Sequence, residues 1–75
     1  MKEIFEQVGN ILNHKLPNFN VVVKSTSDDS YIYFYKNKEI VYVIDITALY
    51  KATLVLDVKT LSEISVLVLK SRGLV

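Results

Sequence analysis

Two β-rich runs separated by only two residues constrain this chain more than any other feature. Ser30–Lys36 and Glu39–Thr47 are dominated by β-branched and aromatic residues, and Asn37-Lys38 lies between them. A third β-rich run, Asn20–Thr26, is separated from the second by the polar turn cluster Ser27-Asp28-Asp29-Ser30. The pattern predicts a three-stranded antiparallel meander with a tight turn at Asn37-Lys38.

The two sides of the predicted hairpin differ in character. If Asn37 and Lys38 form the turn, the cross-strand neighbours are as follows. Tyr35 faces Ile40, Tyr33 faces Tyr42, and Tyr31 faces Ile44. The opposite side carries Ile32, Phe34, Val41 and Val43 and is the expected core face. We expect Tyr31, Tyr33, Tyr35 and Tyr42 to form an amphipathic aromatic face that could be exposed.

The N-terminal segment has the spacing of an amphipathic helix over residues 3 to 16, stopped by Pro17. Glu3 and Glu6 lie near its start and Lys15 near its end, which suits the helix dipole. Its apolar positions are Ile4, Phe5, Val8, Ile11, Leu12 and Leu16.

The C-terminal segment, from Ala48 to Val75, carries two conflicting signals. Residues 52–70 contain enough β-branched side chains to form a further β-hairpin. The same segment has a possible capping box at Thr60-x-x-Glu63 and a plausible helix end near Gly73. We favour one long apolar helix over residues 48–70, with the hairpin as the alternative. The expected fold class is α+β, in one domain spanning residues 1–75.

Composition indicates a binding protein. The chain has 75 residues, of which 51% are hydrophobic, and so small a domain cannot bury all of its apolar surface. We therefore expect an oligomer or a subunit. A net charge of +1 provides no strong field for duplex nucleic acid. The absence of cysteine excludes disulfides and thiolate metal sites, and no signal peptide or membrane span is expected, so a cytoplasmic location is the best fit.

No catalytic or metal-binding constellation is recognisable. His14 is the single histidine and is expected on the polar side of the first helix. Asp28 and Asp29 are too few oxygen ligands for a calcium loop. Asp45 and Asp57 interrupt apolar runs and are best explained as edge or cap positions. We expect no enzyme activity, no cofactor and no metal.

The stretch Tyr31–Leu61 resembles the small dimerisation subunit of the KEOPS complex, the Pcc family. The hairpin Ser30–Ile46 fits that family in length and alternation. Tyr50-Lys51-Ala52-Thr53 stands where the family opens a long helix with Leu-Arg-Ala/Gly-Thr. Lys51 replaces the family arginine, Val55-Leu56 replaces an Asn-Ser pair, the connection after Ile46 is shorter, and the opening strand is missing.

The resemblance implies a non-catalytic accessory or dimerisation subunit that supports threonylcarbamoylation of transfer RNA. The departures favour a divergent paralogue that pairs with a related small subunit as a homo- or heterodimer, touching transfer RNA only through a larger complex. The partner interface would be a helix-helix contact. Its expected residues are Leu49, Lys51, Leu54, Leu56, Val58, Leu61 and Ile64.

Two other functions stay open at this point. The tyrosine face with Lys24 and Lys36 nearby could bind single-stranded nucleic acid by stacking. A small protein inhibitor of viral or mobile-element origin is compatible with the size of the chain but is indicated by no motif.

Overall fold

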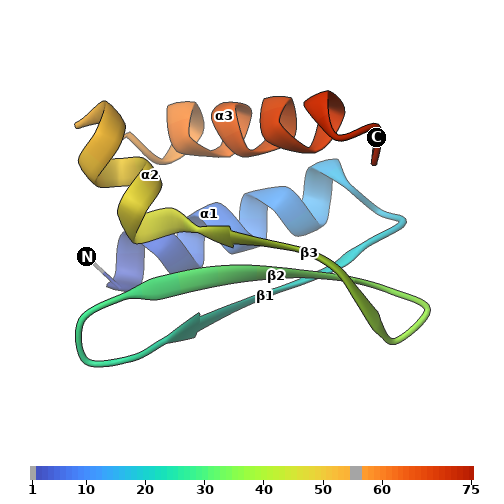
Figure 1. Ribbon diagram of the computed structural model, residues 1–75, viewed down its shortest axis with the longest axis horizontal. Coiled ribbons are helices and arrows are strands. Elements are labelled where there is room, and N and C mark those ends of the chain that lie inside the picture. The colour runs from blue at the N-terminus through green and yellow to red at the C-terminus, as the bar shows by residue number, and fades with distance from the viewer. Residues whose placement is uncertain (1, 55–56) are drawn as a thin grey trace.

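The computed structural model describes residues 2–54 and 57–75 and confirms the α+β class (Figure 1). A helix is followed by a three-stranded antiparallel sheet in the order β1-β2-β3 and then by two helices. The elements are α1 (Lys2–Lys15), β1 (Asn20–Ser25), β2 (Ser30–Lys36), β3 (Glu39–Asp45), α2 (Ile46–Thr53) and α3 (Val58–Ser71).

Helix α1 lies unusually close to strand β1. A Cβ placed on Gly9 would come within 2.6 Å of the Val23 Cγ2 atom, so a residue larger than glycine would require either the Val23 side chain or the helix to shift. The other buried residues of α1 are Phe5, Val8 and Leu12, at the helical spacing seen in the sequence. Close contact between α1 and β1 therefore depends on Gly9.

The sheet contains a β-bulge that the alternation of side chains in the sequence did not predict. Tyr35 pairs with Ile40 as predicted, but the register shifts between Phe34 and Tyr35, so that Phe34 pairs with Tyr42 and Tyr33 with Val43. One extra residue in β3, at Val41, reverses the side on which all later residues of the strand point.

The predicted core face is therefore half right. Ile32 and Phe34 are fully buried, whereas Val41 and Val43, expected beside them, are exposed. The residues that replace them are Ile44, which is buried, and Tyr42, which packs against the core. Placing Tyr42 on the tyrosine face was wrong, because the bulge moves it to the side of the helices, where Arg72 lies 6.0 Å from its ring.

The C-terminal segment is helical as favoured, but it forms two helices rather than one. Helix α2 ends at Leu54, which adopts a left-handed conformation with φ 56° and caps the helix by donating its N–H to the Tyr50 carbonyl. A new helix, α3, starts after Asp57, whose carboxylate accepts hydrogen bonds from the backbone N–H and the hydroxyl of Thr60. The further hairpin over residues 52–70 is wrong, since 58–71 are helical.

Both aspartates within apolar runs are helix caps, as expected. Asp45 accepts a hydrogen bond from the Ala48 N–H at 3.0 Å and begins α2. Asp57 does the same for α3, so the N-terminus of α3 is set by Asp57 and not by the predicted capping box at Thr60-x-x-Glu63. Their carboxylates are thus used structurally.

The core lies between the sheet and the helices. Helices α1 and α3 pack side by side on one face of the sheet, and no helix among the described residues lies on the other face (Figure 1). Aromatic contacts join the layers, with the Phe19 and Phe34 rings edge to face at 6.4 Å. The buried hydrophobic residues are Phe5, Val8, Leu12, Leu16, Phe19, Val21, Ile32, Phe34, Ile44, Ile46, Leu61 and Leu69. One side of the sheet is therefore sealed and the other is bare.

Candidate functional site

The bare side of the sheet forms a regular grid of side chains, which we call the open face. Three rows run across the strands, because the register aligns one residue from each strand in every row. The first row is Asn20, Tyr35 and Ile40; the second is Val22, Tyr33 and Val43; the third is Lys24, Tyr31 and Asp45.

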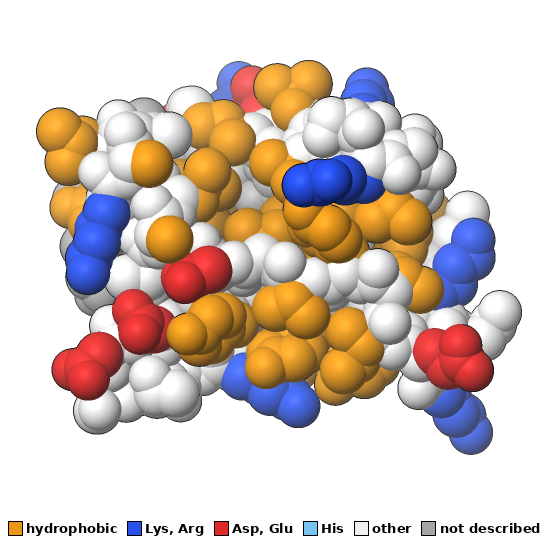
Figure 2. All heavy atoms as spheres, in the orientation of Figure 1, with side chains coloured by type: hydrophobic (Ala, Val, Ile, Leu, Met, Phe, Trp, Pro, Cys, Tyr) orange, Lys and Arg blue, Asp and Glu red, His pale blue; other side chains and the backbone are white. Residues whose placement is uncertain are grey.

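The β3 side of the open face is apolar and accessible. Ile40 is 52% exposed and Val43 is 39% exposed, while Val22 and the three tyrosines are half-buried. The adjacent bulge residue Val41 is also exposed, at 36%. Hydrophobic side chains gather over the strands in the lower part of Figure 2, with acidic side chains at both ends. A contiguous apolar patch of this kind marks an interaction site more often than single scattered apolar residues do.

Lys24 holds the tyrosines of the first two rows in a connected group. Its ammonium lies 4.7 Å from the centroid of the Tyr33 ring and donates to the Tyr35 hydroxyl at 3.4 Å. The Tyr33 and Tyr35 rings stack with centroids 6.4 Å apart and planes inclined by 25°. The cation and two rings therefore support one another.

The third row is electrostatically different. Asp29 and Asp45 lie near Tyr31 and raise the pKa of its phenol above 10.0, because a phenolate there would be repelled by two carboxylates. Lys24 occupies the β1 side of this row and Asp45 the β3 side. The open face thus carries opposite charges at two adjacent corners.

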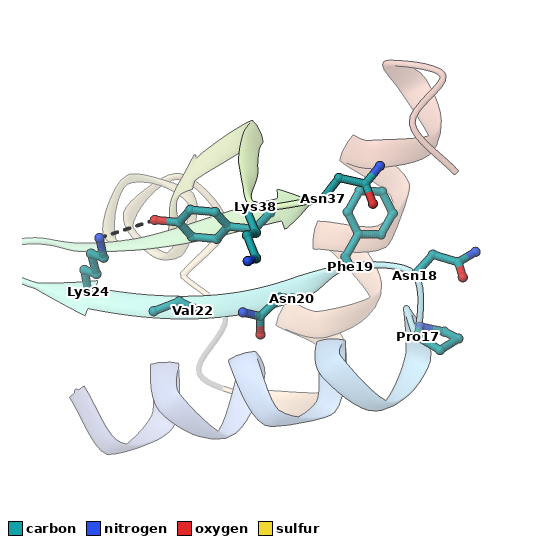
Figure 3. A pocket seen from close by; sticks show the side chains of 9 residues that line it. Pro17, Asn18, Phe19, Asn20, Val22, Lys24, Asn37 and Lys38 are labelled. Atoms are coloured by element: carbon teal, nitrogen blue, oxygen red, sulfur yellow. Dashed lines mark hydrogen bonds between the residues drawn. The ribbon is translucent and has the colours of Figure 1, made fainter.

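A shallow hollow of about 570 Å³ adjoins the first row (Figure 3). The residues Asn37 and Lys38 form one wall and have positive φ angles of 53° and 68°, as the tight turn between β2 and β3 requires. The dashed line in Figure 3 marks the bond from Lys24 to Tyr35 across the hollow. The hollow is lined by Pro17, Asn18, Phe19, Asn20, Val22, Lys24, Tyr35, Asn37 and Lys38.

The two edge strands of the sheet, β1 and β3, differ in what surrounds them. On β1, the Asn13 side chain donates to the Val21 carbonyl and accepts from the Val21 N–H, both at 2.8 Å. The amide thereby occupies two of the backbone groups with which a further strand would pair. Strand β3 forms the other edge and carries the exposed residues Ile40, Val41 and Val43. Apolar accessibility is therefore concentrated on the β3 side of the open face.

The helical interface predicted from the sequence is not one continuous surface. Leu61 is fully buried in the core of this chain, so a partner cannot contact it. Leu49 and Val58 pack against the same core, and Ile64 is half-buried.

The remaining members of that interface are scattered. Lys51 is exposed on α2, Leu54 is 81% exposed at the break between the helices, and Leu56 lies outside the described residues. The break at Leu54 separates residues that the long-helix interpretation had placed in one helix-helix contact.

No metal centre is formed by the part of the chain that the structure describes, since no three His, Asp or Glu side chains come together there. His14 is exposed in the last turn of α1, and Asp28 is exposed in the turn before β2. The described helices are also too short or too polar to cross a membrane.

Comparison with protein-family models, with curated proteins and with solved structures finds no match to this chain.

Sequence reasoning found the three tyrosines of the open face and Lys24, but it missed Val43 and Val22. Val43 was assigned to the core because a bulge of one residue has no sequence signal here. Val22 precedes the hairpin and could have been found from the alternation of β1, in which Val21 and Val23 face the helices.

Proposed function

We propose that this chain is a non-catalytic protein-binding subunit that engages its partner through the open face. The observation that carries the proposal is the sheet side that no described helix covers, with Val43 and Ile40 exposed beside half-buried tyrosines. Tyrosine and exposed aliphatic residues together are characteristic of protein interfaces. Burial of this surface provides the free energy of association, at about 25 cal/mol per Å² before association costs.

A more specific version of this proposal names the partner as a KEOPS-type small subunit. The order of helix, hairpin and helix supports this form, and Tyr50-Lys51-Ala52-Thr53 lies on α2 directly after the hairpin. Strand β1 between α1 and the hairpin, and the end of α2 at Leu54, are further departures from that family. Transfer RNA would be reached only through the larger complex.

Single-stranded nucleic acid is the second candidate ligand. The stacked Tyr33 and Tyr35 rings with the Lys24 ammonium resemble the platforms on which bases stack. The third row argues against it, because Asp45 and the nearby Asp29 would repel a phosphate backbone. Protein binding therefore accounts for more of the open face.

The experiment that tests the proposal compares Val43→Lys with the control Leu67→Lys. Both residues are exposed and apolar, but Leu67, 61% exposed on α3, lies away from the open face. Solution mass is measured by light scattering, alone and with a KEOPS dimerisation subunit. We expect Val43→Lys to abolish association and Leu67→Lys to preserve it.

Three results would count against the proposal. Association that survives Val43→Lys but is lost in Leu67→Lys would move the interface to α3. A chain that stays monomeric in the presence of every candidate protein would contradict a protein-binding function. Salt-sensitive binding of an RNA oligonucleotide that is lost in Tyr33→Ala would favour the nucleic-acid candidate.

A further inference from the structure

We infer that the partner on the open face is a second copy of this chain, related by a two-fold axis that runs parallel to the strands along β2. This inference rests on the proposed function, since it names the occupant of the same face. It follows from how the rows of the open face are ordered from β1 to β3.

Rotation about that axis keeps each row opposite itself and exchanges the β1 and β3 sides. In the second row, Val22 then faces Val43 of the second copy and Tyr33 faces Tyr33. The flanking contacts are apolar, and the exposed Val43 side chain of each copy becomes covered by Val22 of the other.

The third row supplies the charge complementarity. Lys24 lies on the β1 side and Asp45 on the β3 side, so the rotation brings Lys24 of each copy opposite Asp45 of the other. The two pairs form at adjacent corners of the interface, where charged groups fix orientation more than they add affinity. A single chain thus carries both halves of each pair, as a two-fold interface requires.

The other in-plane axis, perpendicular to the strands, is disfavoured by the same grid. It would put the third row of one copy on the first row of the other. Asp45 would then lie against Ile40 and Lys24 against Asn20. A carboxylate on an aliphatic side chain loses water without gaining a partner.

The tyrosines are compatible with this arrangement. Facing sheets keep their strand directions within about 30° of each other and lie about 10 Å apart. The rotation lets the rings of Tyr31, Tyr33 and Tyr35 pack offset from those of the second copy, which is a favoured aromatic geometry.

Charge exchange between copies tests the inference directly. Lys24→Glu or Asp45→Lys alone makes both corner pairs like-charged, and each should raise the dimer dissociation constant about tenfold. A mixture of the two variants should form a heterodimer with both pairs attractive, restoring wild-type affinity. Native mass spectrometry with one chain isotopically labelled distinguishes heterodimer from homodimers.

Asp45 also caps α2, so a second variant at the same position guards against loss of folding. Asp45→Asn removes the charge but keeps a side chain that can cap α2, and its mixture with Lys24→Glu should recover affinity in part, because one corner pair is then attractive and the other is neutral. Circular dichroism establishes that each variant is folded. Leu67→Lys is the control and should dimerise as the wild type does.

The outcomes separate this inference from the proposed function. A wild-type chain that stays monomeric up to millimolar concentration, or folded variants whose mixtures fail to recover, would overturn the second-copy arrangement. If Val43→Lys still blocks a different protein partner in that case, the proposed function stands. A dimer that ignores Val43→Lys as well as all charge variants would overturn both.

Discussion

The two faces of the sheet come from the same strands and yet differ in how far water reaches their side chains. Phe34 and Ile32 alternate with Tyr33 and Tyr35 along β2, and the first pair is fully buried while the second is partly accessible. The core face excludes water and stabilises the fold. The open face has large apolar groups without a cover, which is a cost to an isolated chain and a source of free energy to a complex.

The comparison teaches that hydrophobicity does not separate the two roles in this chain. Val43 is as apolar as Ile44, and only the pairing register decides that one is exposed and the other buried. Substitutions on the two faces should therefore change different measured properties of the chain. Core-face changes should alter the free energy of unfolding, and open-face changes should alter association.

The largest effect is expected from truncating the core face. Phe34→Ala should lower the free energy of unfolding by about 3–5 kcal/mol, because it removes a fully buried ring and leaves a cavity. Tyr33→Ala, the matched change on the open face, should cost only about 1 kcal/mol. Urea denaturation at low protein concentration measures both, and equal losses would contradict the distinction between the faces.

A smaller effect is expected from the sheet edge that α1 protects. Asn13→Ala removes both hydrogen bonds to Val21 and should cost about 1–2 kcal/mol. It also frees the β1 edge, so aggregation on mild heating should increase. Asn10→Ala, at an exposed position of the same helix, is the control. Identical melting and light scattering of the two variants would show that the edge needs no cover.

Gly9→Ala probes how closely α1 covers the core face. The added Cβ would press on the Val23 methyl group at 2.6 Å, so we expect a net loss of about 1 kcal/mol despite the better helix propensity of alanine. In a Val23→Ala background the clash is removed, and Gly9→Ala should become stabilising. A double-mutant cycle by thermal unfolding checks this change of sign, and a stabilising effect in both backgrounds would contradict it.

The smallest effect lies at the start of α3. Hydrogen bonds from Thr60 lower the pKa of Asp57 below 3.8, so the folded state favours the ionised carboxyl group. This contribution to stability is present above the ordinary pKa of the group and is lost as the pH falls through the lowered value. Asp57→Asn should therefore flatten the loss of stability below pH 3.8 relative to wild type, as followed by urea midpoints. Parallel pH profiles would contradict the cap.

The fold was largely predictable because its local signals agree. The apolar spacing before Pro17, the turn at Asn37-Lys38 and the alternation of β2 each point to the element that the structure contains. Asp57 and Asp45 were expected at edge or cap positions from their places in apolar runs, and both are helix caps. These features depend on residues close together in the sequence.

The candidate site was less predictable because it depends on longer-range geometry. The bulge at Val41 exchanged the positions of Tyr42 and Val43 relative to the expectation. The left-handed Leu54 likewise divides a segment whose side chains would suit one helix, and leucine has no preference for that conformation. Neither departure has a local sequence signature.

The most direct test of the open face as an interface is an NMR dilution series of the isotopically labelled wild-type chain, from millimolar to low micromolar concentration. We expect concentration-dependent shift changes centred on Val22, Tyr33 and Val43, with Leu54 and Leu67 unchanged. Changes centred on Leu54 and Leu67 would contradict it and return the interface to the helices. Spectra that do not change with concentration would contradict self-association through the open face.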